Sequence, residues 1–163
     1  MSDKVSHTIK SFLDKTGVDY EFMDCDPELA DTADFCAHYG ESLEKSANAI
    51  LIKAKTGEEK FACCVLLAHT RLDVNKSARK KLGARRVSFA SSDETKAITG
   101  MQLGGVTPIG LPDDLPLWVD SRVSECDYII LGAGTRSAKL KVSPTIFEHT
   151  ANTEFVEGLA KDS

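Results

Sequence analysis

The fold can be worked out from two apolar runs, Asn48-Ala-Ile-Leu-Ile-Lys-Ala54 and Phe61-Ala-Cys-Cys-Val-Leu-Leu-Ala68. The polar segment Lys55-Thr-Gly-Glu-Glu-Lys60, which contains a glycine, joins them. Two apolar runs around such a turn predict a β-hairpin. Because the second run is apolar at successive positions, both of its faces need cover, and we expect that strand to be central in its sheet.

Helical patterns flank the predicted hairpin. The residues that support them share helical spacing or a capping role: Val5, Ile9, Phe12 and Leu13 before Gly17; Asp73 ahead of Val74, Ala78, Leu82 and Gly83; the capping box Ser91-Ser-Asp-Glu94 before Gly100; and Ser143-Pro144. Apolar residues at this spacing form the buried stripe of a helix, while Ser, Asp and Gly mark its ends. We also expect a loop and a short helix between Pro27 and Gly40.

Shorter strands are predicted at Val18–Met23, Leu117–Val119, Tyr128–Leu131 and Lys139–Val142. The first alternates like a half-buried strand, and the others are short apolar or alternating runs beside turn residues. Strands and helices alternate irregularly around a hairpin. The sequence therefore predicts an α+β (mixed α/β) fold with a mixed sheet and flanking helices, in one domain spanning residues 1–163.

Composition excludes several classes of protein. The chain is 42% hydrophobic and 28% charged, which is typical of globular domains, and it has no apolar run long enough for a transmembrane helix. The first residues do not resemble a signal peptide. The five cysteines include no C-x-x-C pair, so we expect reduced thiols in a cytoplasmic protein. No membrane partner is expected.

Charge is distributed unevenly. The net charge is −5, yet Arg71–Arg86 holds seven basic residues against one acid. Lys76, Arg79 and Lys80 fall on the outward face of the helix predicted there. A local basic surface on an acidic body can hold a phosphate backbone without general affinity for nucleic acid, and the alternative is an ordinary solvated face. DNA is not an expected partner.

Two glycine segments are candidate binding loops. Gly104-Gly-Val-Thr-Pro-Ile-Gly110 offers backbone N–H groups that could bind a carbonyl or carboxylate oxygen, or is merely a turn that needs positive φ. Gly132-Ala-Gly134 follows a strand, but Ser137 stands where a dinucleotide-binding motif needs its third glycine. No histidine has metal-ligand spacing, so neither a metal ion nor another cofactor is expected.

The ordered motifs resemble the YbaK family of editing domains, which includes the domain inserted in bacterial prolyl-tRNA synthetases and free-standing relatives that act in trans. The resemblance covers about residues 20–150. Its segments occur in the family's order: Asn48-Ala-Ile-Leu-Ile52, Asp73-Val-Asn-Lys76, Leu82-Gly83, Thr99-Gly100, Gly104–Gly110, Gly132-Ala-Gly-Thr-Arg136, Lys139-Leu140 and Ser143-Pro144.

The resemblance implies a partly barrel-like mixed sheet and an activity, hydrolysis of the ester between a wrongly attached amino acid and the tRNA 3′ end. Aminoacyl-tRNA would be the partner, and an aminoacyl-tRNA synthetase is a second candidate. The glycine loop would contact the aminoacyl ester and the terminal adenosine. The site residues carried over are Asn48, Gly104 and Gly105 for catalysis, and Val106, Thr107, Pro108, Gly132, Gly134 and Arg136 for substrate binding. Lys76, Arg79 and Lys80 would bind tRNA.

The chain departs from the family pattern at two positions. Asn48 stands where many members have an essential lysine, and asparagine brings hydrogen bonds but no positive charge. Lys45 lies outside the strand, and Lys53 should face away from Asn48. Gly132 stands where a polar side chain is common, and we expect it to enlarge the pocket.

Two functions follow. The first is a deacylase that acts on mischarged tRNA in trans, with Asn48 orienting the ester or a water and the glycine loop stabilising the developing oxyanion. The second is a noncatalytic module that binds an aminoacyl-adenosine end, an amino acid or a nucleotide.

Overall fold

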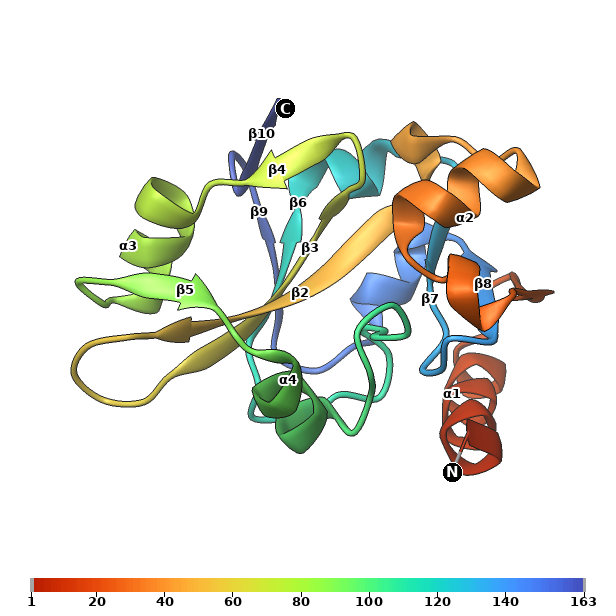
Figure 1. Cartoon of the computed structure of the whole chain (residues 1–163), viewed down its shortest axis with the longest axis horizontal. Coiled ribbons are helices and arrows are strands. Elements are labelled where there is room, and N and C mark those ends of the chain that lie inside the picture. The colour runs from red at the N-terminus through yellow and green to blue at the C-terminus, as the bar shows by residue number, and fades with distance from the viewer. Residues whose placement is uncertain (1, 163) are drawn as a thin grey trace.

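A five-stranded mixed sheet forms the centre of the protein, in the order β5-β2-β3-β6-β9. The computed structural model describes residues 2–162, with side chains from His7 onward. The strands of this sheet are β2 (Ala47–Ala54), β3 (Phe61–Leu67), β5 (Val87–Phe89), β6 (Leu117–Asp120) and β9 (Thr153–Val156). Figure 1 shows them running side by side, with helices on either side.

The predicted hairpin is confirmed, and its second strand is central. β3 pairs antiparallel with β2 and parallel with β6. Cys63 and Val65 belong to one apolar cluster, whereas Cys64 and Leu66 belong to another on the opposite face of the sheet. Both faces of β3 are therefore buried, which explains why its sequence shows no alternation of polar and apolar residues.

A three-stranded antiparallel sheet lies beside the first, in the order β1-β8-β7. It contains β1 (Tyr20–Asp24), β7 (Ile129–Gly132) and β8 (Ala138–Val142). A parallel bridge between Ser46 and Ile130 connects it to the start of β2. The central sheet is mixed, as predicted, but the sheets do not close into a barrel. The junction between them brings the amino end of β2 close to β7.

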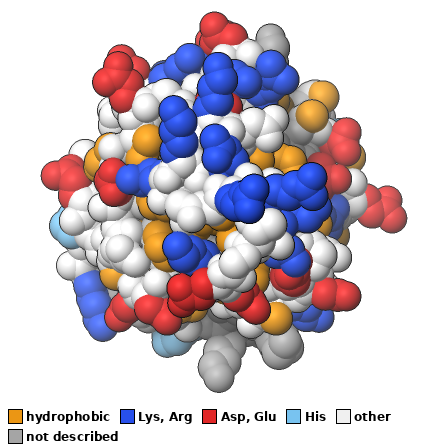
Figure 2. Space-filling view, turned by 90° about the vertical axis from the view of Figure 1, so that its left-hand side faces the viewer, with side chains coloured by type: hydrophobic (Ala, Val, Ile, Leu, Met, Phe, Trp, Pro, Cys, Tyr) orange, Lys and Arg blue, Asp and Glu red, His pale blue; other side chains and the backbone are white. Residues whose placement is uncertain are grey.

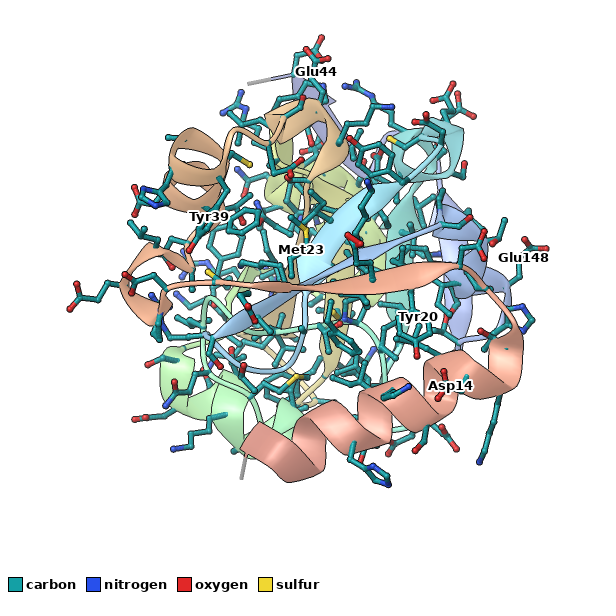
Figure 3. All side chains as sticks on the ribbon, turned by 90° about the vertical axis from the view of Figure 1, so that its right-hand side faces the viewer. Asp14, Tyr20, Met23, Tyr39, Glu44 and Glu148 are labelled. Carbon is teal, nitrogen blue, oxygen red and sulfur yellow. The ribbon has the colours of Figure 1, made fainter. Side chains whose placement is uncertain are left out.

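Helix α1 (Ser2–Thr16) packs along the small sheet. The Tyr20 hydroxyl donates to Asp14 and accepts from Lys10, which also pairs with Asp14. Figure 3 shows Asp14 and Tyr20 facing one another between α1 and β1. Ile9 and Leu13 are buried as predicted. The side chain of Val5 lies outside the described residues.

The other α-helices lie at predicted positions: α2 (Thr32–Tyr39), α3 (Arg79–Leu82) and α4 (Ser92–Thr99). The helix predicted from Ser143 is the 3-10 turn η5 (Pro144–Glu148), and η1 (Pro27–Leu29) lies in the predicted loop before α2. The 3-10 turns η2 (Leu43–Lys45) and η4 (Ser121–Glu125) were not predicted. The Ser91 capping box is present, and Gly83 and Gly100 end their helices with left-handed backbone. The segment before α3 differs from the prediction, because η3 (Val74–Ala78) is a single turn of π-helix.

The C-terminal strands were not predicted. β10 (Ala160–Asp162) pairs with β4 (Thr70–Leu72), and β9 extends the central sheet. Asp120 explains how they are held: its buried carboxylate accepts from the amides of Ala160 and Arg122, at 2.7 and 3.0 Å. No helix within residues 2–162 is long and apolar enough to cross a membrane.

Asp120→Ala should lower the free energy of unfolding by about 2–3 kcal/mol, because it leaves two amides without their carboxylate acceptor. Urea denaturation measures this loss. The matched control is Asp162→Ala, which removes an exposed carboxylate paired with Arg122 and should cost under about 1 kcal/mol. Equal losses in the two variants would contradict the role given to Asp120.

Candidate functional site

A small pocket of about 70 Å³ opens where the two sheets meet. It has room for on the order of two waters or a small side chain. Its lining comes from four separate segments: Thr32, then Ala47, Asn48 and Ala49, then Leu103, Gly104 and Val106, and finally Gly132 and Lys139. The structure thus brings Asn48 and the glycine loop together in one wall, as the sequence analysis predicted.

Asn48 reaches this pocket from the second residue of β2. Its Oδ1 accepts a hydrogen bond from the Thr32 hydroxyl at 2.5 Å. The Nδ2 group donates to no other residue within 2–162, so both of its hydrogens are available to a ligand. The adjacent lysines lie elsewhere: Lys45 pairs with Asp127, and Lys53 faces the other side of the sheet and pairs with Glu94.

The backbone carbonyls of the glycine loop are turned toward the protein. Arg136 donates to Leu103 O at 2.7 Å, and Gly134 N donates to Gly105 O at 2.7 Å. In a planar trans peptide the N–H points opposite to the C=O. The amides of Gly104 and Val106 therefore point away from these partners, and neither donates to any residue within 2–162.

Gly105 differs from its neighbours. Its amide donates to Gln102 O at 2.9 Å inside the turn, so it is not available to a ligand. Gly105 was predicted to be catalytic, but among the described residues it is the Val106 amide that has no acceptor. Thr107 is fully buried, and its hydroxyl accepts from Ile109 N. Pro108 lines a different hollow, so neither of these two residues contributes to the lining of the pocket.

The glycines are required by close contact between the loop and residues 132–136. A Cβ on Gly105 would lie 2.6 Å from the backbone of Thr135, and one on Gly132 would lie 2.2 Å from Val106 O. Gly104, at φ +87°, would place a Cβ 2.0 Å from the Arg136 guanidinium. The expectation that Gly132 enlarges the pocket is therefore wrong, because the Val106 carbonyl fills the space that a side chain would take.

Arg136 connects three segments of the chain. Besides Leu103 O, it donates to Pro27 O at 3.0 Å and to Asp31 at 3.4 Å. Together with the Gly134 amide, it fixes the glycine loop against η1 and the segment after β7. Both residues had been predicted to bind substrate, whereas their contacts are with the protein itself and hold the loop in place.

Lys139 is a further residue of the pocket, and it was not predicted from the sequence. Its side chain is buried at 5% exposure and reaches into the pocket from β8. Nζ donates to Ala30 O at 2.5 Å and to Gly104 O at 3.1 Å. Burial lowers the pKa of Lys139 below the usual value for lysine. The sequence gives little signal for this, because Lys139-Leu-Lys-Val142 alternates like a strand with an exposed basic face.

The two adjacent thiols of β3 are buried. Burial raises the pKa of Cys63 to about 12 and that of Cys64 well above its ordinary value, so neither thiol is activated. Within residues 2–162, no group of three or more His, Cys, Asp or Glu side chains could hold a metal ion. A larger hollow of about 440 Å³ lies around Tyr20, Tyr128 and Lys141, away from the glycine loop.

The predicted basic surface is present around α3. Figure 2 shows Lys and Arg side chains gathered on the face that carries α3 and β5. Its exposed members include Arg71, Lys76, Lys80, Arg85 and Arg86, and Arg79 is half-buried. α3 packs against the face of β2 that contains Ile50 and Ile52. By strand alternation Asn48 projects from this same face of β2.

A family model described as "Aminoacyl-tRNA editing domain" matches residues 26–148. The chain belongs to this family. The match includes Asn48, the glycine loop, the basic surface and Lys139, so every segment that lines the pocket lies within the editing domain.

Individual relatives agree with this assignment. A protein of Enterococcus faecalis named "Putative Cys-tRNA(Pro)/Cys-tRNA(Cys) deacylase EbsC" is 26% identical over 113 residues, which are 69% of this chain and 66% of that protein. Among solved structures, the hypothetical protein APE2540 has a TM-score of 0.80 at 22% identity, covering 94% of this chain and 99% of its own. One titled "a putative trans-editing enzyme for prolyl tRNA synthetase" has a TM-score of 0.78 at 17% identity, covering 98% of both chains. These likenesses confirm the fold.

Gly132→Ala should destabilise this editing domain by about 1–3 kcal/mol, because the new methyl group must displace the Val106 carbonyl. Chemical denaturation measures the loss, and a crystal structure of the variant should show the glycine loop moved away from β7. A variant with unchanged stability and an unmoved loop would contradict the close contact described here.

Proposed function

We propose that this editing domain hydrolyses the ester of mischarged aminoacyl-tRNA in trans, at the pocket between β2 and the glycine loop. One observation carries the proposal: Asn48, Gly104 and Val106 line the same small cavity, and the backbone amides of the last two have no acceptor among the described residues. These are the groups that the hydrolysis of an ester needs, because its transition state develops negative charge on the carbonyl oxygen.

The reaction needs no side-chain nucleophile. A water, activated by a group of the substrate itself, attacks the carbonyl carbon of the ester. The bond from that carbon to the ribose oxygen breaks, the ribose oxygen takes up a proton, and the free amino acid and the tRNA leave. Gly104 and Val106 donate to the carbonyl oxygen as it becomes negative, and Asn48 orients the ester or the water.

The size of the pocket favours a small amino acid. About 70 Å³ accepts the acyl end but not an adenosine, which must lie outside on the rim. Leu103 is on that rim with 51% of its surface exposed, and it offers an apolar surface to the terminal base. We therefore expect the amino acid to enter while the tRNA end rests against the glycine loop.

The basic surface supports binding of the tRNA itself. Its side chains surround α3, on the same face of β2 as Asn48, so that an acceptor stem held there could direct its 3′ end to the pocket. Phosphate contacts by Lys76, Arg79 and Lys80 would fix the stem without reading its bases. A synthetase partner and a cytoplasmic location stay predictions of the sequence.

Purified protein should deacylate tRNAs that carry small, wrongly attached amino acids, and Asn48→Ala should lower this rate about 100-fold because one oriented polar group is lost. The measurement is release of radiolabelled amino acid from a panel of mischarged tRNAs of increasing side-chain size. Lys45→Ala is the matched control, since this neighbouring residue points away from the pocket, and it should keep the wild-type rate.

Two results would contradict this proposal. Full turnover by Asn48→Ala would remove the role given to Asn48. Absence of turnover on every tRNA of the panel, together with measurable binding of a non-hydrolysable aminoacyl-adenosine, would instead identify a noncatalytic binding module.

Arg79→Ala and Lys80→Ala should each weaken tRNA binding, and each should reduce the slope of log affinity against log salt concentration by about 1. Each substitution removes one cation that would displace counterions from the phosphates. Filter binding across a series of salt concentrations measures the slope. Lys15→Ala changes an exposed residue of α1 away from the basic surface, and it should leave the slope unchanged. Slopes equal to that of the wild type in all three variants would exclude α3 from the tRNA interface.

A further inference from the structure

Lys139 is a buried cation with no ion-pair partner among the described residues, since Asp31, the carboxylate that acts on it at longer range, pairs with Arg136. Its side chain is 5% exposed, and it forms no salt bridge with any residue in 2–162. Its two hydrogen-bond acceptors are backbone carbonyls, of Ala30 and Gly104, which carry no net charge. The ring of Phe35 lies 5.6 Å from Nζ. A buried charge without a counter-ion is costly, so its presence needs an explanation.

One hydrogen of the ammonium group remains unused. A lysine carries three donors, and Ala30 O and Gly104 O take two of them. The same side chain lines the pocket together with Asn48 and Gly104. The third hydrogen is therefore available beside the two donors already assigned to the ester.

We propose that the Lys139 ammonium contacts the ester carbonyl oxygen in this pocket and supplies the positive charge that stabilises the oxyanion. The inference rests on the proposed function and adds a catalytic residue to it. Asn48 brings no charge, and the glycine-loop amides bring only dipoles, so Lys139 is the one full positive charge among the residues that line this cavity.

A purely structural role is the alternative, because Lys139 ties the segment before α2 to the glycine loop. The two roles differ in what restores activity. A charge placed elsewhere in the pocket can stabilise an oxyanion, but it cannot remake the hydrogen bonds to Ala30 O and Gly104 O. Asn48→Lys places such a charge in the same wall of the cavity.

The test compares four proteins in the deacylation assay: wild type, Lys139→Met, Lys139→Met with Asn48→Lys, and the control Lys141→Met. Lys141 is two residues along the same strand, stacked on Tyr128 at 4.3 Å, and lies outside the pocket. We expect Lys139→Met to lower kcat about 100-fold with a smaller change in KM, and Lys141→Met to keep the wild-type kcat. The double variant should regain at least about tenfold of the loss.

Thermal unfolding of each variant accompanies the kinetics. Lys139→Met with normal folding and wild-type kcat would overturn the inference. So would a loss of kcat that Asn48→Lys leaves unrepaired in a folded double variant, because that result indicates a scaffold role. If Lys139→Met does not fold, Lys139→Arg provides the same test: it keeps the charge and should retain most of the rate.

The pH profile adds an independent measurement. Oxyanion stabilisation needs the charged lysine, so the enzymatic rate, corrected for spontaneous hydrolysis, should fall as pH rises through the lowered pKa of Lys139. The groups around Nζ are Cys25, Asp31, Cys36 and Arg136. Lys139→Arg should move this fall to higher pH, whereas Lys141→Met should leave it in place. A profile unchanged in Lys139→Arg would contradict the inference.

Failure of this inference differs from failure of the proposed function. A wild type that deacylates no tRNA of the panel and binds no aminoacyl-adenosine analogue overturns the proposed function, and the inference with it. A wild type that deacylates while Lys139→Met matches it overturns the role of Lys139 alone. If the wild type binds the analogue without hydrolysing tRNA, Lys139→Met should bind the analogue at least about tenfold more weakly than the wild type. Equal affinities of the two proteins would overturn the contact.

Discussion

The site depends on one close approach of backbone to backbone, between the glycine loop and the turn after β7. Gly105 and Gly132 lie so near Thr135 and Val106 O that a methyl group at either position would overlap backbone atoms. This contact fixes which way the loop peptides face, because each carbonyl finds a partner in residues 132–139. The amides of Gly104 and Val106 are left unpaired as a consequence. The fold thus orients the N–H groups of these peptides by holding the C=O groups, which point the opposite way.

Two cations complete this arrangement in different ways. Arg136 is partly exposed and binds carbonyls of both η1 and the glycine loop, so its charge is shared with solvent and with Asp31. Lys139 is buried and has only neutral partners. Both hold the segment before α2 against the loop, but only Lys139 keeps an unused donor in the pocket. Arg136, just before β8, therefore fixes the loop, while Lys139, on β8, gives the pocket its charge.

Much of this could be predicted from the sequence. The hairpin, the capped helices and the meeting of Asn48 with the glycine loop all followed from periodicity, turn residues and family resemblance. The predictions that failed concern contacts between distant segments. Nothing in Gly132-Ala-Gly134 indicates that a carbonyl of residue 106 occupies the space above Gly132. Likewise, Lys139 resembles an exposed strand residue until η1 and α2 are seen to cover it. β10 is short and mostly polar, and its position depends on contacts with distant residues, through its pairing with β4 and its hydrogen bond to Asp120.

The position of Asn48 has a physical consequence for the charge of the site. A lysine at that position would stand in the same small cavity as Lys139, and two like charges separated by a few ångströms in a low dielectric repel strongly. An asparagine avoids that repulsion and still offers two donors. An uncharged residue 48 is thus compatible with a buried lysine at residue 139. The single cation of the cavity then comes from β8 and not from β2. Placing the charge on β8 also couples it to the loop, because the ammonium that faces the ligand holds the Gly104 carbonyl at 3.1 Å. The donors of the loop and the charge would then move as one unit.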